Sequence, residues 1–439
     1  MPSPIFRRAL RPALALILFP AAALAQAPAT TTLTLGDAAR IAAERAPSVI
    51  GARARAVQGA ARTMQARAEL LPQLSSEASV DGGTESSGLP TGTYLGGAPR
   101  PVSGRTVDVR LQATQKVLDL GAIRRMKAAS TEADALGHGA VAASEAAASR
   151  GALAWLEVQR ADARLAARVA DSALAAELLD IARQRLQAGT AIALDVTRAE
   201  SQLASIVSQL ITARSARARA ELELVHALAL PVSTRVQLGD TLGAPGAGAD
   251  EVQESAAVET AMQRRGDLLA AGSYAEAARR QISAVKADRL PTVSLFSSAA
   301  STSGGTLDNR SYGVSVSFSL FDGFRRESRI AQYRAEEQEA DAEWLDIRNR
   351  IVVDVRSAML DLAAAKEQVA AADVRLRLAE QEVEQARERF SAGVAGNSDV
   401  IQASLTLNQA RDVVVDARTT YHQARVNLAA AQGTVREIR

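Results

Sequence analysis

The chain has 439 residues, a formal net charge of +2 and no cysteine. This nearly neutral balance argues against a nucleic-acid-binding protein, which needs a strongly basic face. Without cysteine the chain forms no disulfide, and no lipid can be attached to an N-terminal cysteine.

Residues 1–25 are predicted to form a secretory signal peptide. Three arginines lie at its basic end, a short apolar run follows, and cleavage is expected between Ala25 and Ala27. The run is short for an uncleaved membrane anchor, and no later stretch of about 18 apolar residues predicts a transmembrane helix. The mature chain is therefore expected to be exported, and it could enter a membrane only as β-strands.

Each half of the mature chain begins with two short helices. In the first half a helix is expected over 34–46 with Thr34 as its N-cap, and Pro47 separates it from a second helix over 48–70. The second half follows the same plan around Gly266. In both halves a Leu-Pro pair ends the second helix, because proline cannot continue it.

A β-hairpin is predicted after each Leu-Pro pair, over about 72–117 and 291–321, because apolar residues there recur with a period of two. In the last strand serine and glycine alternate with large apolar residues. A soluble β-sandwich would show the same alternation, but export and the presence of only four strands favour a membrane barrel. The apolar side is expected to face lipid, and its residues are Tyr312, Val314, Val316 and Phe318.

Long helical hairpins follow the strands, over about 124–230 and 326–432. Apolar residues spaced three and four apart predict coiled-coil seams, and roughly 65 residues of helix would extend about 100 Å. The turns of the two hairpins lie in 183–203 and 387–407, which are identical at nine of 21 positions.

The repeated order of elements predicts an internally duplicated chain. Its first structural repeat spans 33–231 and its second spans 255–437, with an inter-repeat linker at 232–254. The glycines of this linker are not a phosphate loop, since no Lys-Ser or Lys-Thr pair follows them.

Each hairpin turn contains a glycine where a left-handed residue is needed to end a helix, Gly189 in the first turn and Gly393 in the second. Asn397 and Ser398 are predicted to cap the helix that follows the second turn.

No arrangement of residues predicts catalysis. The three histidines, His138, His226 and His422, have no metal-ligand spacing, and the chain contains no nucleophile elbow, HExxH sequence or P-loop. We therefore expect no enzyme activity, no metal and no cofactor.

The chain is expected to work as an oligomer. In a bilayer the open edges of a four-stranded sheet would leave N–H and C=O groups unpaired, and a single helical hairpin buries only one apolar stripe. Even strand numbers from about 8 upward are possible. Four strands per chain therefore allow a dimer, a trimer or a tetramer, and these considerations do not choose among them.

The layout resembles the TolC-like outer-membrane efflux family over about residues 33–435. The matching features are the segment LTLGDAARIAAERAPSVIGARA, both Leu-Pro strand entries, LFDGFRR at 320–326, and the AG…DV turns at 188–196 and 392–400. The resemblance implies a mixed α/β membrane protein. Three chains would form a 12-stranded antiparallel β-barrel in the outer membrane, continued across the periplasm by a long coiled-coil helical barrel with an equatorial belt that includes the linker.

The resemblance also implies a function. The homotrimer would be an export duct that docks with a periplasmic adaptor protein and an inner-membrane pump, either proton-driven or ATP-driven. Substrates would pass through it without energy from the chain itself.

The two hairpin turns would form the periplasmic end of this duct. Asp399 matches an acidic position of the family's constriction, Gln402 stands where a second acid is expected, and Asp195 is the equivalent of Asp399 in the first turn. The same resemblance implies contact with the adaptor at Gly189, Gly393, Val196 and Val400.

Two other classes of protein remain open. A periplasmic adaptor also has long helical hairpins, but normally a single one flanked by compact β-domains. An exported structural coiled-coil protein would not need the four strands. The sequence does not indicate which substrate is transported.

Overall fold

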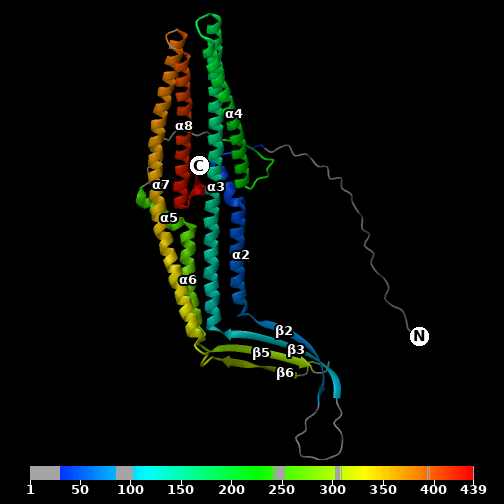
Figure 1. The fold of residues 1–439 in the computed structure, drawn as a ribbon. Coiled ribbons are helices and arrows are strands. Elements are labelled where there is room, and N and C mark those ends of the chain that lie inside the picture. The colour runs from blue at the N-terminus through cyan, green and yellow to red at the C-terminus, as the bar shows by residue number, and fades with distance from the viewer. Residues whose placement is uncertain are drawn as a thin grey trace, which may run out of the picture.

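The chain forms an elongated rod of helices with a four-stranded sheet at one end (Figure 1). The computed structural model describes residues 30–85, 102–240, 243, 253–301, 307, 309–392, 394 and 396–438. The predicted signal peptide and its cleavage site lie outside the described residues.

Two helices run along most of the rod: α3, Leu120–Gln187, and α7, Arg325–Ser391. They contain 68 and 67 residues, so each extends about 100 Å at roughly 1.5 Å per residue. The carboxylate of Asp119 caps α3 by accepting a hydrogen bond from the N–H of Ala122 at 2.8 Å. This cap makes α3 begin earlier than the sequence pattern predicted.

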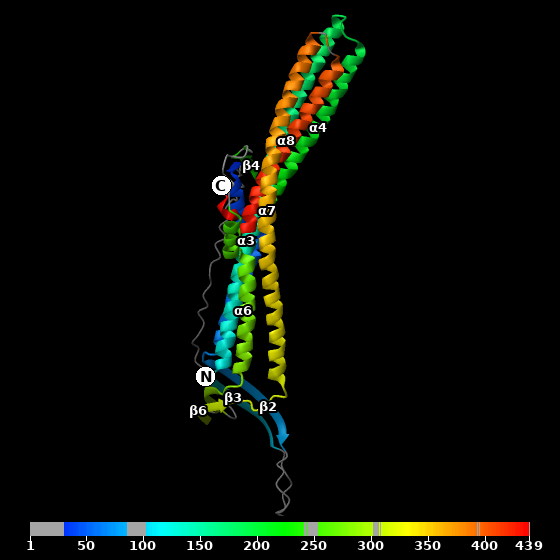
Figure 2. The same ribbon diagram turned by 90° about the vertical axis from the view of Figure 1, so that its left-hand side faces the viewer.

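Shorter helices pack along the two long ones. Near the sheet these are α2, Pro47–Ala68, and α6, Gly266–Ala287; toward the far end they are α4, Ala193–Ala227, and α8, Asn397–Gln432. The α3–α4 and α7–α8 turns both lie at the end of the rod farthest from the sheet (Figures 1 and 2). The rod therefore separates the hairpin turns from the sheet by its full length.

Small elements surround the middle of the rod. They are α1, Leu35–Arg45, α5, Glu254–Arg264, a 3-10 helix, Val435–Glu437, and a parallel pair of short strands, β1, Thr30–Leu33, with β4, Arg235–Leu238. The predicted linker, 232–254, thus contains a strand. A four-residue strand with a distant partner leaves little periodicity in the sequence, which is why the pattern did not indicate it.

The two predicted helix caps have different outcomes. At α1 the prediction is confirmed, because Oγ1 of Thr34 accepts a hydrogen bond from the N–H of Asp37 at 3.1 Å. At α8 it is wrong: the N-cap residue is Gly396, and neither Asn397 nor Ser398 caps the helix with its side chain. Glycine adopts the extended cap conformation without a side-chain bond, which leaves Asn397 available for a contact described below.

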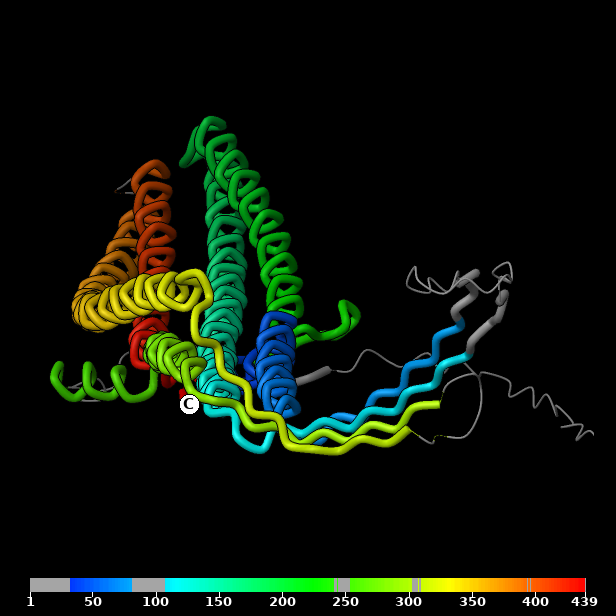
Figure 3. Tube along the Cα trace, turned by 90° about the horizontal axis from the view of Figure 1, so that it is seen from below, coloured from blue at the N-terminus to red at the C-terminus, as the bar shows by residue number. Residues whose placement is uncertain are grey.

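The sheet is antiparallel throughout, in the order β2-β3-β5-β6. Its strands are β2, Gln73–Glu85, β3, Val102–Leu118, β5, Thr292–Ser301, and β6, Asn309–Ser317. From below, the strands run side by side and curve away from the helices (Figure 3). β6 ends just before Phe318, which was predicted to lie within it.

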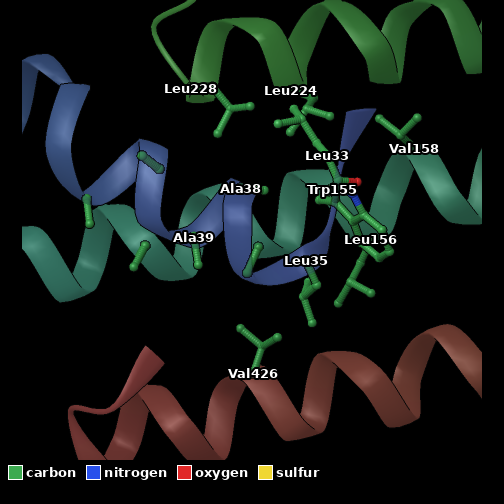
Figure 4. Close-up of a cluster of buried hydrophobic side chains, with 14 of the residues drawn as sticks. Leu33, Leu35, Ala38, Ala39, Trp155, Leu156, Val158, Leu224, Leu228 and Val426 are labelled. Atoms are coloured by element: carbon green, nitrogen blue, oxygen red, sulfur yellow. Dashed lines mark hydrogen bonds between the residues drawn. The ribbon is translucent and has the colours of Figure 1, made fainter. Parts of the chain in front are cut away.

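Small residues allow a close approach of helices in the middle of the rod. A Cβ atom on Gly151 of α3 would lie 2.6 Å from the Cβ of Ala42 and 2.7 Å from the carbonyl oxygen of Ala38, both in α1. Nearby, the indole N–H of Trp155 donates a hydrogen bond to the carbonyl of Leu33 at 3.0 Å, within a cluster of buried side chains (Figure 4). These contacts fix α1 and β1 on α3.

Candidate functional site at the hairpin turns

The first hairpin turn ends α3 with two hydrogen bonds. The N–H of Thr190 donates to the carbonyl of Arg185 at 2.9 Å, and that of Gly189 donates to the carbonyl of Leu186 at 3.1 Å. Gly189 has a φ angle of 72°, in the left-handed region that favours glycine. This is the Schellman arrangement, and it confirms the predicted conformation of Gly189.

The second hairpin turn has the same long hydrogen bond. The N–H of Val394 donates to the carbonyl of Arg389 at 2.9 Å. Gly393 and Ala395 lie outside the described residues. The bond from Val394 to Arg389 is the counterpart of the bond from Thr190 to Arg185 in the first turn.

The two turns, residues 185–196 and 389–402, lie against each other, and we call them together the tip. Asn397 is 1% exposed, and its side-chain amide donates a hydrogen bond to the carbonyl of Asp195 at 2.8 Å. The structure therefore brings together two segments that are about 200 residues apart in the chain.

A second contact across the tip involves an arginine and an aromatic ring. The guanidinium group of Arg185 donates a hydrogen bond to the carbonyl of Phe390 at 2.6 Å and lies 4.6 Å from the centroid of that residue's ring. An ion pair between Arg387 and Glu177 joins the same two helices, α7 and α3. These contacts hold one hairpin turn to the other.

The predicted gate residues lie at the surface of the tip. Asp399 and Gln402 are exposed, and Asp195 is partly exposed. The carboxylate of Asp399 accepts a hydrogen bond from Oγ of Ser398 at 3.5 Å. Within the described chain, no ion pair neutralises Asp195 or Asp399. Each chain therefore presents two uncompensated carboxylates at its tip.

The residues predicted to contact an adaptor are not all at the surface. Gly189 is exposed and Val196 is partly buried, whereas Val400 is fully buried against Leu178 and Phe390. Val400 therefore supports the tip from within.

A set of exposed apolar side chains at the tip was not predicted from the sequence. They were visible as apolar residues in turns, where polar residues are usual. The set comprises Leu186, Ile192, Leu194 and Val394.

A buried ionic cluster, also missed, joins the two hairpins farther from the tip. Asp171 of α3 is 0% exposed, and it accepts hydrogen bonds from Arg168 at 3.0 Å and from Arg411 of α8 at 2.5 Å. Arg168 also pairs with Asp412 of α8. Burial raises the pKa of Asp171 above its ordinary value and outweighs the two guanidinium groups, which lower it.

At the opposite end of the molecule, one face of the sheet is apolar and exposed. The register of the four strands brings these side chains onto the same face, opposite a face rich in serine and charged residues. Tyr312 is 87% exposed, and Phe318 is also exposed although it follows the strand. The exposed apolar residues of this face are Leu74, Val80, Val107, Leu111, Leu295, Tyr312, Val314 and Val316.

The described residues contain neither a cluster of metal ligands nor a helix that could span a membrane. No group of three or more histidine or acidic side chains there could hold a metal ion. None of the described helices is long and apolar enough to cross a membrane.

The fold is that of outer-membrane channels of known structure. The outer membrane protein VceC from Vibrio cholerae matches with a TM-score of 0.77 and 20% identity, over 91% of this chain and 96% of that one. The open state of the MtrE outer membrane channel of Neisseria gonorrhoeae matches with a TM-score of 0.74 and 19% identity, over 91% and 88%.

The chain belongs to the outer membrane efflux protein family, whose model matches residues 38–230 and 257–434. The predicted family, and with it the assignment as an outer-membrane efflux protein, is confirmed. The family and its structural neighbours are efflux proteins and channels, not enzymes.

Two curated relatives are similar over part of their length. Protein CyaE of Bordetella pertussis is 29% identical over 261 residues, which are 57% of this chain and 54% of that protein. Outer membrane protein TolC of Vibrio cholerae is 25% identical over 302 residues, which are 66% of this chain and 68% of that protein. The match thus spans about half of the first relative and two thirds of the second.

Proposed function

We propose that three copies of this chain form a passive duct of a tripartite efflux or secretion system. The duct would carry substrates from an inner-membrane pump across the periplasm and the outer membrane. The pump would supply the energy and most of the specificity, while this chain would supply the path. No catalytic step is part of the proposal.

One observation supports it most directly: a sheet with an exposed apolar face, whose two edges have no strand partner among the described residues, lies at the end of a rod about 100 Å long. Its edge strands, β2 and β6, run in opposite directions because the sheet has an even number of antiparallel strands. Copies can therefore join edge to edge with antiparallel pairing throughout. Three copies would close a barrel of about 12 strands without unpaired backbone groups in lipid.

The order of elements supports the proposed domain layout. Two short helices, a strand pair and a long helical hairpin occur twice along the chain. We assign these to two repeats, 33–231 and 255–437, joined by an equatorial linker at 232–254, with residues 1–25 as the signal peptide. The linker would form a belt with the small elements around the middle of the rod.

The tip would be the periplasmic mouth of the duct, because it lies at the end of the rod farthest from the sheet (Figure 1). In a trimer the uncompensated carboxylates of Asp399 and Asp195 would form rings of negative charge. Gln402 lies three residues after Asp399 and so shares its helix face. We propose that these residues set the ion preference of the mouth.

The tip would also dock a periplasmic adaptor protein. The exposed apolar side chains of Leu186, Ile192, Leu194 and Val394 support this, since a partner would remove them from water. Gly189, Gly393 and Val196 would lie within or beside this surface, and Val400 would support it from below.

Fractionation and conductance test the duct. The mature protein should stay in the outer membrane after a carbonate wash and should form ion-conducting pores in planar bilayers. Release by carbonate would refute the membrane duct and favour a periplasmic adaptor or a structural coiled-coil protein.

The gate has its own test in the same bilayers. Asp399→Ala should lower the preference for cations and weaken block by divalent cations, because it removes a ring of carboxylates. Ser391→Ala, which changes an exposed neutral residue of the tip whose hydroxyl bonds the carbonyl of Glu388 and not Asp399, should change neither. If Asp399→Ala leaves selectivity and block unchanged, Asp399 is not part of the gate.

A further inference from the structure

A recess interrupts the wall of the rod where α6 begins and α8 ends. Both helices contact α3 and α7, α6 on the side toward the sheet and α8 on the side toward the tip (Figure 1). α8 ends at Gln432, followed by Gly433 with a left-handed φ angle of 71°, and α6 begins at Gly266. The gap between the two ends leaves a recess of about 710 Å³, lined by residues of all four helices.

Small side chains keep this space open. Its lining includes five alanines, two from α3, one from α7 and two from α8, which are Ala142, Ala146, Ala358, Ala430 and Ala431. They give the recess an apolar floor. Its volume lies within the range of roughly 300–1,000 Å³ that is usual for sites of small organic molecules.

The C-terminal segment closes the recess on one side. Glu145, a residue of the lining, accepts a hydrogen bond from the N–H of Val435 at 2.9 Å and pairs with Arg436, both of the 3-10 helix. Arg264, the last residue of α5, pairs with Glu437 of the same 3-10 helix at 2.5 Å. These contacts tie the belt elements together across the gap between α6 and α8.

The recess faces away from the belt. At about 100° per residue, Asp361 lies about 140° around α7 from Arg356, which pairs with Glu254 of α5 at 2.6 Å. Ala146 lies about 140° around α3 from Gly151, which contacts α1. In Figure 2, β4 and the C-terminus also lie on one side of the rod. The belt must be outside the proposed duct, because it would otherwise obstruct the path, so the recess opens into the duct.

Carboxylates of the lining are only partly neutralised. Arg265 is 16% exposed and pairs with Asp267 at 2.6 Å and with Asp354 at 2.7 Å, so two carboxylates share one guanidinium group. Asp361 is exposed, and no ion pair neutralises it within the described part of the chain. The recess therefore has a free carboxylate beside a shared cation.

The remaining charges of the lining leave this balance negative. Arg436 compensates Glu145, as described above. Arg150 is held toward α2, because its guanidinium group donates a hydrogen bond to Oγ of Ser48 at 2.8 Å. Three carboxylates, of Asp267, Asp354 and Asp361, thus remain against two guanidinium groups.

We propose that this recess binds organic cations, such as amines or quaternary ammonium ions with an apolar body, as they pass through the duct. The alanines receive the apolar body, and the carboxylates attract the charge. No three acidic or histidine side chains of the described residues could hold a metal ion, so the geometry favours an organic cation over a bare metal ion. This inference rests on the proposed function, because the recess must face the path of the substrate.

The absence of cysteine allows binding to be measured by protection of a single introduced thiol. Ser357→Cys places a thiol in the lining, and Ala371→Cys places one two heptads farther along the same face of α7. In the purified full chain, benzyltrimethylammonium at ten times its Kd should slow the reaction of Ser357→Cys with N-ethylmaleimide about tenfold, because only the free recess reacts. Ala371→Cys should react at an unchanged rate. Ser149→Cys, on the α3 side of the recess, gives a second reading if Ser357→Cys does not fold.

The charge of the ligand and of the recess are tested separately. Phenylmethanesulfonate, which has a similar aromatic body but an anionic group, should not protect Ser357→Cys. Asp361→Asn should raise the Kd of benzyltrimethylammonium about fivefold, the effect of one charge at about 4 Å in water. Glu367→Gln, which changes an exposed carboxyl of α7 outside the recess, should leave the Kd unchanged. Equal protection by the two ions, or an unchanged Kd in Asp361→Asn, would overturn the cation site.

The outcomes distinguish this site from the duct. If the protein conducts ions in bilayers but benzyltrimethylammonium protects neither Ser357→Cys nor Ser149→Cys, the recess is not a cation site and the duct stands. Protection in a protein that carbonate releases from the membrane and that conducts no ions would support the site and refute the duct.

Discussion

Single residues set how closely the helices of the rod approach. A Cβ atom on Gly266 would lie 2.6 Å from the carbonyl oxygen of His138 and 2.7 Å from the nitrogen of Ala142, both backbone atoms of α3. A Cβ atom on Gly137 of α3, by contrast, would have no neighbouring atom within 4 Å among those of other elements. The two glycines therefore serve different purposes although both lie in helices.

We predict opposite effects when each of these glycines becomes alanine. Gly266→Ala should destabilise the protein by about 1–3 kcal/mol, because α6 must move away from α3. Gly137→Ala should stabilise it by roughly 0.5–1 kcal/mol, because alanine loses less backbone entropy in a helix. Thermal unfolding in detergent measures both. A Gly266→Ala protein as stable as the wild type would show that α6 does not need this close approach.

Arg183 and Arg185 are two residues apart but bind different hairpins. Arg185 crosses to Phe390 of α7, whereas Arg183 pairs at 2.7 Å with Glu200 of its own hairpin, with both side chains about half exposed. Arg185→Ala should raise single-channel conductance or open probability, because the two turns lose a hydrogen bond and a cation–π contact. Arg183→Ala should change neither, since exposed ion pairs contribute little. Equal behaviour of the two variants would exclude a special role for Arg185.

At the scale of elements, α3 and α8 meet at the buried ionic cluster around Asp171. Burial raises the folded-state pKa of Asp171 above its value in the unfolded chain. Proton binding at Asp171 therefore favours the folded state. This contribution is fully present below the unfolded pKa of about 4 and is lost as the pH rises through the folded-state pKa.

Asp171→Asn should remove this dependence. The stability of the wild type relative to Asp171→Asn should fall as the pH rises from about 4 to about 7, because only the wild type must ionise a buried carboxyl. Asp361→Asn changes an exposed carboxyl of α7. The stability of the wild type relative to this variant should stay nearly constant over the same pH range. Melting temperatures across this range measure the effect, and a wild-type advantage that grows with pH would contradict it.

Sequence patterns predicted those elements whose signals are local. Period-two alternation indicated the strands, and glycine with its flanking residues indicated the hairpin turns. The pairing of β1 with β4 escaped prediction, because two four-residue strands about 200 residues apart leave no periodic signal.

The candidate site was predictable only in part, for a similar reason. Position in a turn singled out Asp195 and Asp399, but the side chain of Asn397 serves a contact between hairpins rather than a cap within one. The burial of Asp171 also depends on its partner in α8, Arg411. A seam is recognised by the spacing of its apolar residues, so this pattern does not indicate a charged residue buried between helices. Contacts between hairpins thus account for the roles of Asn397 and Asp171, which the sequence did not reveal.

The whole molecule, taken as one chain, leaves several surfaces that a membrane protein must cover. Both edges of its sheet lack a strand partner among the described residues. Apolar side chains are also exposed along the rod, including Val57 of α2, Ile211 of α4 and Leu360 of α7. Lipid cannot pair with the backbone groups of the open sheet edges, and water does not favour the exposed apolar helix faces, so a single chain is not expected to be a stable monomer.

We therefore predict that association and folding are inseparable. In detergent the complex should have the mass of three chains by sedimentation equilibrium, and dilution should not release folded monomers. On heating, loss of the three-chain species should coincide with loss of helical circular dichroism, because a released chain would expose its edges and apolar faces together. A complex of two or four chains would refute the 12-stranded barrel. A helical monomer that persists after dissociation would show that the rod folds without its neighbours.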